Sequence, residues 1–204
     1  MHLRITLTGT MNNKEYWENF YKDNHTKEPS DFAKSLIFVE KRILDMGCGN
    51  GRDTLLFDDL RNAVIGLDEF APNGPCFWRM LIEDFLTDES KNRIKFDVLY
   101  MRFLLHAIEE KLEHDILAWA SKNVKEVAIE CRSDKGIIPN RSHDRRLING
   151  DKLKLKLISA GFKIDYYFEG TGVAIYQHKS SIDGTMFFDD PLIIRIIARN
   201  ESNF

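Results

Sequence analysis

The sequence predicts an α/β protein in which helices cover a mainly parallel β-sheet. Short apolar segments rich in β-branched and aliphatic residues alternate with segments of helical periodicity, and this alternation is typical of parallel sheets. A second observation is the glycine-rich segment LDMGCGNG, residues 44–51, which continues the first apolar segment. Because ligands bind beyond the carboxyl ends of parallel strands, these glycines indicate where a functional site lies.

The expected strands are short apolar segments spread along the chain. In order they are KRILDM, NAVIGLDEF, KFDVLYM, VKEVAIECR, GFKIDYYFEG and DPLIIRIIARN. Each is bounded by polar, glycine or proline residues, as strands usually are. The sequence therefore predicts at least six strands.

Helices are expected before and between these strands. EPSDFAKSLIFV contains a short helix for which Ser30 or Asp31 is the N-cap. Leu112 and Ile116 recur at helical spacing in EEKLEHDILAWASKN. DKLKLKLISAG reads as a helix that stops at Gly161.

One connection is shorter than a parallel crossover requires. Only eight residues, EFAPNGPC, separate Asp68 from the next apolar segment, FWRMLIEDF, whereas a crossover usually takes about a dozen residues or more. Two prolines and a glycine disfavour a helix within it. Either the helix after the second strand is missing, or FWRMLIEDF is itself a helix, with Phe77, Leu81 and Phe85 on one face, and a strand is lost. Both alternatives stay open.

Composition indicates a single globular domain over residues 1–204. The net charge is −3, and no apolar run approaches the length of a membrane span. We therefore expect no nucleic-acid or membrane partner. The three cysteines lack metal-ligand spacing and fit free thiols, which predicts a cytoplasmic location. Residues 1–13 read as a tag or disordered start, 14–40 as an N-terminal helical lid and 41–199 as the core. No metal is expected.

The glycine-rich segment indicates the chemistry of its ligand. The glycines are Gly47, Gly49 and Gly51, a G-x-G-x-G pattern, and Arg52 stands where the dinucleotide fingerprint has its third glycine. Asp45 would repel a pyrophosphate but can accept a hydrogen bond from an ammonium group. Asp68, at the end of the second strand, can accept both ribose hydroxyls. A ligand with a cationic head, a ribose and no phosphate fits these residues, and S-adenosylmethionine has that description.

ILDMGCGNGRDTLLF resembles the first motif of the class I S-adenosylmethionine-dependent methyltransferases. VIGLDEF resembles their ribose-binding second strand, and FDVLYMRFLLHAI their fourth strand and the loop after it. The resemblance covers residues 14–199. YWENFY, PSDFA, RFLLHAI, IECRSD, HDRR and DDPLIIRIIA further resemble a bacterial-type subgroup found with surface-glycan and phosphonate biosynthesis genes.

The resemblance implies a Rossmann-like sandwich whose seven-stranded, mainly parallel sheet has an antiparallel last strand. It also implies S-adenosylmethionine as cofactor and S-adenosylhomocysteine as product. The implied cofactor-binding residues are Asp45, Gly47, Cys48, Gly49, Asn50 and Gly51 for the methionine end, Asp68 and Glu69 for the ribose, Asp84 and Phe85 for the adenine, and Arg102 after the fourth strand. The family normally has a full helix between Asp68 and Asp84, and this chain departs from it there.

Candidate acceptor-binding and catalytic residues follow the later strands. Arg145 and Arg146 in NRSHDRRLING can grip a phosphate, phosphonate or carboxylate in bidentate fashion, although a solvated basic loop is an equally simple explanation. Arg132 can face the same cleft, and Tyr21 belongs to an aromatic segment that can cover the cofactor. His143 and His106 are the candidate general bases, with a buried structural role as the alternative for His106.

The function that the sequence predicts is methyl transfer to oxygen or nitrogen of a small, anionic or sugar-like acceptor by a monomer or homodimer. A protein or RNA methyltransferase is an alternative, but MRFL stands where an N-P-P-Y-type element would be expected. A non-catalytic S-adenosylmethionine-binding module is a second alternative, supported by the shortened connection after Asp68. Arg52 disfavours a nicotinamide-dependent oxidoreductase.

Overall fold

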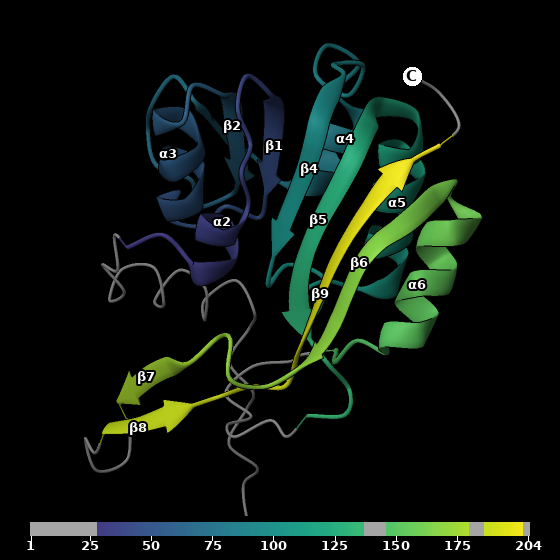
Figure 1. Ribbon diagram of the computed structural model, residues 1–204. Helices are drawn as coiled ribbons and strands as arrows, with labels where there is room; N and C mark the ends of the chain where they lie inside the picture. The colour runs from purple at the N-terminus through teal and green to yellow at the C-terminus, as the bar shows by residue number, and fades with distance from the viewer. Residues whose placement is uncertain (1–27, 137–145, 180–185, 202–204) are drawn as a thin grey trace, which may run out of the picture.

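The computed structural model describes residues 28–136, 146–179 and 186–201, and seven of its strands form one sheet (Figure 1). The sheet strands are β1 (Arg42–Met46), β2 (Ala63–Asp68), β3 (Phe77–Arg79), β4 (Phe96–Arg102), β5 (Val124–Arg132), β6 (Phe162–Gly170) and β9 (Ile193–Asn200). Their order is β3-β2-β1-β4-β5-β9-β6. The strands from β3 to β5 pair in parallel, and β9 is antiparallel to both of its neighbours. The predicted sheet is confirmed.

Helices cover both faces of the sheet (Figure 1). They are α2 (Asp31–Ser35), α3 (Arg52–Asp59), α4 (Ile82–Thr87), α5 (Glu110–Asn123) and α6 (Gly150–Ser159). α4, α5 and α6 contribute Phe85, Ile116 and Leu157 to the larger hydrophobic core on one face. α2 and α3 contribute Phe32 and Phe57 to a smaller core on the other face. Within the described residues no helix has the length and apolar character needed to span a membrane.

The connection between β2 and β3 contains no helix. Residues 69–76 join the two parallel strands directly, which confirms the first of the two alternatives. The segment FWRMLIEDF divides into the three-residue strand β3 and the helix α4, so a single helix over it is wrong. The ring of Phe77, the first residue of β3, packs against the glycine loop. A Cβ atom at Gly51 would lie only 2.5 Å from this ring.

A hairpin separates β6 from β9. Gly170 of β6 and Arg132 of β5 both pair with Ile193 of β9, so residues 171–192 leave and return at the carboxyl end of β5. They contain β7 (Tyr176–Lys179) and β8 (Met186–Asp189), which pair antiparallel. The hairpin projects beyond this edge of the sheet (Figure 1). No element was expected here from the sequence.

The segment before β1 confirms the predicted short helix. Ser30 is the N-cap of α2, and its hydroxyl accepts a hydrogen bond from the backbone N–H of Ala33 at 3.0 Å. Of the predicted helical lid over residues 14–40, only the part from residue 28 lies within the described residues. The predicted tag or disordered start, residues 1–13, lies outside them.

Candidate functional site

The glycine loop joins β1 to α3 in a backbone conformation that favours glycine. Gly47, Gly49 and Gly51 have φ values of 79°, 55° and 77°, which side chains with a Cβ rarely adopt. The backbone N–H groups of Gly47 and Cys48 donate to the carbonyl oxygen of Leu67, at 2.8 and 3.3 Å. The loop is therefore fastened to the end of β2. Cys48 and Asn50, also predicted in the site, belong to this loop.

Asp68 ends β2 and orders the loop from the opposite side. Its Oδ2 accepts a hydrogen bond from the N–H of Gly49 at 3.1 Å, and its Oδ1 accepts one from the N–H of Phe70 at 2.8 Å. An ionised carboxylate can accept about four hydrogen bonds, so two further donors, such as vicinal hydroxyls, can still bind. Burial raises the pKa of Asp68. Glu69, also predicted in the site, is its neighbour and begins the short connection to β3.

Asp45 is a buried acid at the carboxyl end of β1. Its carboxylate accepts a hydrogen bond from the Thr54 hydroxyl at 2.6 Å, and the residue is only 2% exposed. Burial raises the pKa of Asp45 to about 8, and the negative charges of Asp53 and Asp68 act in the same direction. A ligand cation beside this carboxyl would favour its ionised form. The buried acid and the glycine loop together fit a ligand with an ammonium group.

Gly66 makes room for the Thr54 hydroxyl. A Cβ atom at Gly66 would lie 2.7 Å from Thr54 Oγ1, so a side chain there would displace the donor that holds Asp45. Neither Gly66 nor Thr54 was singled out from the sequence. The only signal for Thr54 is its place in the first turn of the helix that follows the glycines.

The two residues predicted to contact adenine differ in exposure. Asp84 is exposed in the first turn of α4, and its role stays a prediction. Phe85 is 0% exposed and packs edge-on against Trp119, with ring centroids 5.1 Å apart, and beside Trp78. Its side chain is therefore part of the hydrophobic core, and a contact of Phe85 with the cofactor stays a prediction.

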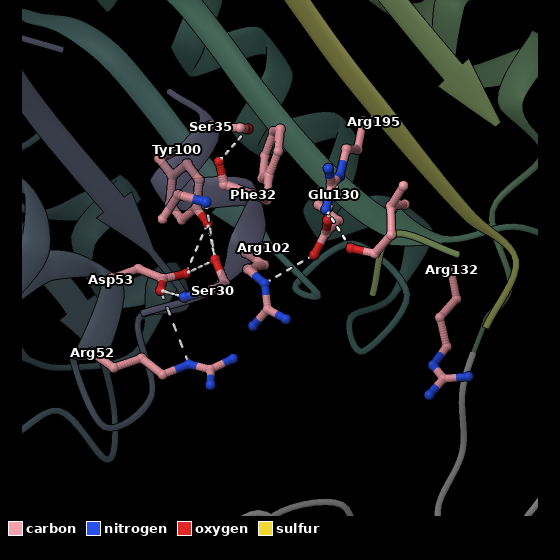
Figure 2. A network of polar contacts seen from close by, with 12 residues as sticks. Ser30, Phe32, Ser35, Arg52, Asp53, Tyr100, Arg102, Glu130, Arg132 and Arg195 are labelled. Carbon is pink, nitrogen blue, oxygen red and sulfur yellow. Dashed lines mark hydrogen bonds and ion pairs between the residues drawn. The ribbon is translucent and has the colours of Figure 1, made fainter. Parts of the chain in front are cut away.

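A buried polar network surrounds Asp53, in the first turn of α3 (Figure 2). Asp53 accepts hydrogen bonds from the Ser30 N–H and hydroxyl, both at 2.7 Å, and from the Tyr100 hydroxyl at 2.8 Å. This network joins α2, α3 and β4, so it fixes the segment before β1 against the start of α3. Asp53 was not predicted, because its donors come from residues 23 and 47 positions away.

A second buried network crosses the ends of β4, β5 and β9. Glu130, 1% exposed, accepts hydrogen bonds from Nε of Arg102 at 2.9 Å and from Nε of Arg195 at 2.7 Å (Figure 2). Arg195 also donates to the carbonyl oxygen of Val173 at 2.9 Å, which fastens the root of the hairpin. One carboxylate thus positions two guanidinium groups, and the predicted site residue Arg102 is one of them.

His106 is buried beside the end of β5. Its Nδ1 accepts a hydrogen bond from the backbone N–H of Arg132 at 3.3 Å, and the residue is 2% exposed. The Nδ1 lone pair that a general base would use is therefore engaged in the fold. This contact favours the structural alternative over the catalytic one for His106.

Arg146 is paired with a buried acid of the fold, and its role in acceptor binding stays a prediction. Its guanidinium donates to the carboxylate of Glu113, which is 1% exposed, and to the carbonyl oxygen of Leu105 at 3.1 Å. Lys156 donates to the same carboxylate at 2.8 Å. Arg146 thus stabilises Glu113, a buried acid of α5.

Three predicted site residues, Tyr21, His143 and Arg145, lie outside the described residues. Their roles stay predictions. Arg132, the last residue of β5, is 6% exposed and lies at the carboxyl edge of the sheet. In the part of the chain that the structure describes, no group of three or more His, Cys, Asp or Glu side chains could hold a metal ion.

The strand order defines a Rossmann-like α/β fold, and the two acids around the glycine loop form a candidate ligand site at the ends of β1 and β2. No protein-family model matches the sequence, and no curated protein matches it significantly. Solved structures of S-adenosylmethionine-dependent methyltransferases do share the fold, at low sequence identity.

Three solved structures illustrate the likeness of the fold. One, from work on the conversion of a disulfide bond into a thioacetal group during echinomycin biosynthesis, has a TM-score of 0.67 at 16% identity and covers 95% of this chain and 94% of its own. The 1,6-didemethyltoxoflavin-N1-methyltransferase of Burkholderia thailandensis, with S-adenosylhomocysteine bound, has a TM-score of 0.64 at 16% identity. The match covers 96% of this chain and 93% of the methyltransferase. TehB of Haemophilus influenzae has a TM-score of 0.64 at 16% identity, and the match covers 92% of this chain and 68% of TehB. The fold of this chain is therefore that of the class I methyltransferases.

Proposed function

We propose that this chain is an S-adenosylmethionine-dependent methyltransferase that acts on oxygen or nitrogen of a small acceptor, anionic or sugar-like in character. The observation that carries the proposal is the pair of acids, Asp45 and Asp68, on either side of a glycine loop with left-handed backbone. A fold shared with methyltransferases does not by itself establish activity. The proposal therefore depends on these site residues.

Each residue of the pair has a task that its surroundings support. Asp68 would accept hydrogen bonds from the ribose hydroxyls through the capacity that Gly49 and Phe70 leave on its carboxylate. Asp45 would accept from the ammonium of the methionine moiety, held in place by the Thr54 hydroxyl. The glycine loop would allow close approach of the ligand to the backbone. The bound cofactor supplies a methyl group on a sulfonium centre.

The task left to the chain is mainly alignment. Displacement at a sulfonium releases a neutral group, and positioning of two reactants can contribute roughly 7–11 kcal/mol. The polar networks around Asp53 and Glu130 hold α2, α3 and the ends of β4 and β5 in one arrangement. They provide the rigid support that alignment needs. His143 stays the predicted general base for a hydroxyl or ammonium acceptor.

One likeness supports a small acceptor. The Burkholderia thailandensis structure, which matches over 96% of this chain, holds 1,6-didemethyltoxoflavin together with S-adenosylhomocysteine. A fold of this size can thus hold both a cofactor product and a small molecule.

The test is release of S-adenosylhomocysteine from S-adenosylmethionine in the presence of single acceptors from a set of phosphorylated, phosphonate and sugar compounds. Wild-type chain should release it with at least one acceptor, and Asp68→Ala should not. Asp59→Ala, a change of the same kind at an exposed position of α3, should keep wild-type activity. Equal release by wild type and Asp68→Ala would overturn the proposal.

A further inference from the structure

Two arginines at the carboxyl edge of the sheet are arranged around one aromatic ring. Arg102 ends β4 and Arg132 ends β5. Their guanidinium carbons lie 4.5 Å and 5.9 Å from the centroid of the Phe103 ring. Figure 2 shows both side chains extending to the same side, beyond the ends of the strands. Residues from two strands thus place two guanidinium groups around one aromatic ring.

Phe103, which carries this ring, has a backbone conformation that is unfavourable in free energy. Phe103 has a φ of 56°, and the left-handed region costs a residue with a Cβ atom roughly 1–2 kcal/mol. Its backbone N–H donates to the carbonyl oxygen of Glu130 at 2.7 Å, and its ring contacts that of His106 edge-on at 5.3 Å. Strained residues that the surroundings hold in place cluster at functional sites. The conformation therefore points to a positioning role for Phe103.

The arginines lie beside the site proposed for the methionine end of the cofactor. Asp45 pairs with Tyr100 in the sheet, and Arg102 follows Tyr100 by two residues. The charge of Arg102 also acts on the Asp45 carboxyl, where it opposes the rise in the pKa. An acceptor group held at Arg102 and Arg132 would thus lie next to the methionine end.

The chemistry of the pair favours an oxyanion. Guanidinium groups present planar, bidentate donors that match phosphate, phosphonate and carboxylate oxygens. Both are shielded from water, since the Arg102 side chain is 13% exposed and Arg132 is 6% exposed. Charge-assisted hydrogen bonds are stronger in such surroundings than in water. Glu130 fixes Arg102 through its Nε and shares its carboxylate with Arg195.

We propose that Arg102 and Arg132, held on the ring of Phe103, form a subsite for an oxyanion of the methyl acceptor. The proposal rests on the proposed function, since it assigns the chemical class of the acceptor at the same site. It places anion recognition on residues other than Arg145 and Arg146, the pair that the sequence suggested.

The test is calorimetric titration of inorganic phosphate into the full chain saturated with S-adenosylhomocysteine, with sodium chloride at the same ionic strength as the reference. Wild type should bind phosphate with a dissociation constant in the millimolar range. Arg132→Gln should weaken it about tenfold or more, and Arg132→Lys by a smaller factor because the charge remains. Arg93→Gln is the matched control, because Arg93 is exposed and pairs with Glu89 on the surface; it should bind as wild type does.

The outcomes separate this proposal from the proposed function. Binding of S-adenosylhomocysteine together with equal phosphate affinity in wild type and Arg132→Gln would overturn the oxyanion subsite alone. Absence of phosphate binding to wild type would also overturn it. If S-adenosylhomocysteine does not bind, the proposed function fails, and the same phosphate titrations without it still decide whether the arginines bind an oxyanion. Should Arg132→Gln not fold, Arg132→Lys and Phe103→Leu provide the comparison, each with weakened phosphate binding expected.

Discussion

The backbone N–H of Gly49 donates a hydrogen bond to Oδ2 of Asp68, at 3.1 Å. This contact joins the middle of the glycine loop to the residue that ends the neighbouring strand. The acid orders the loop, and under the proposed function it would also offer its remaining acceptor capacity to the ribose hydroxyls. Loop conformation and ligand affinity should depend on the same side chain.

Asp68→Ala should lower the affinity for S-adenosylhomocysteine by about tenfold or more. The substitution removes the acceptors of the Gly49 and Phe70 N–H groups as well as the proposed partner of the ribose, and a hydrogen bond to a charged group contributes roughly 1.5–3 kcal/mol. Calorimetry on Asp68→Ala and on the surface control Asp59→Ala measures the effect. Equal affinities in the two variants would show that Asp68 has no part in binding.

The pH dependence of stability should carry the signature of Asp45. Burial raises its pKa from 3.8 to about 8 in the folded chain, so the unfolded chain loses this proton at lower pH. The contribution of Asp45 to stability is fully present below the unfolded pKa and is lost as the pH rises through the folded pKa. Between the two values this group should lower the free energy of unfolding by about 1.4 kcal/mol per pH unit.

Asp45→Asn removes this titration while it keeps an acceptor for the Thr54 hydroxyl. The stability of Asp45→Asn relative to wild type should therefore increase as the pH rises from 5 to 8, a range that lies between the unfolded and the folded pKa of Asp45. Urea unfolding at pH 5, 6, 7 and 8 measures the difference. A difference that does not change with pH would contradict the elevated pKa.

Gly51→Ala should destabilise the chain more than Gly172→Ala. Both glycines have left-handed backbone, with φ of 77° and 83°, but a Cβ atom at Gly51 would lie 2.5 Å from the Phe77 ring, whereas one at Gly172 would meet nothing within 4 Å. Gly172→Ala thus measures the backbone cost alone, roughly 1–2 kcal/mol. Thermal unfolding should show a clearly larger loss for Gly51→Ala. Similar losses of stability in the two variants would mean that the close approach of Phe77 to Gly51 does not affect the free energy of unfolding.

Arg146→Met should reduce stability and leave acceptor kinetics unchanged. It removes one of the two cations on buried Glu113, while Lys156 remains, so the free energy of unfolding should fall by about 1–3 kcal/mol. Arg93→Met, at an exposed position, should have little effect. A steep rise in the acceptor KM of Arg146→Met with unchanged stability would instead support the anion-binding role that the sequence suggested.

The sequence predicted features that depend on local patterns. The glycine spacing and the acids at residues 45 and 68 located the loop, and the prolines between Asp68 and Phe77 disfavoured a helix there, although two alternatives for this connection stayed open. The alternation of strands and helices predicted the layers of the fold. Each of these signals is complete within a short stretch of chain.

Features that depend on distant partners were not predicted. Arg146 reads as half of an anion-binding pair until Glu113, 33 residues away, is seen beside it. Arg195 lies 65 residues from Glu130 in sequence and has the appearance of an ordinary strand residue. Phe85 has the right place in its motif, but its burial between Trp78 and Trp119 is set by the packing of α4 on α5. Pairings of this kind leave no local signal in one sequence.

The central claim is that the glycine loop and its two acids bind S-adenosylmethionine. The most direct measurement is calorimetric titration of the full chain with S-adenosylhomocysteine, with NADH as the control ligand. This account predicts binding in the micromolar range for S-adenosylhomocysteine and none for NADH. Absence of S-adenosylhomocysteine binding would contradict it, and the loop would then be a strand-to-helix turn without a cofactor.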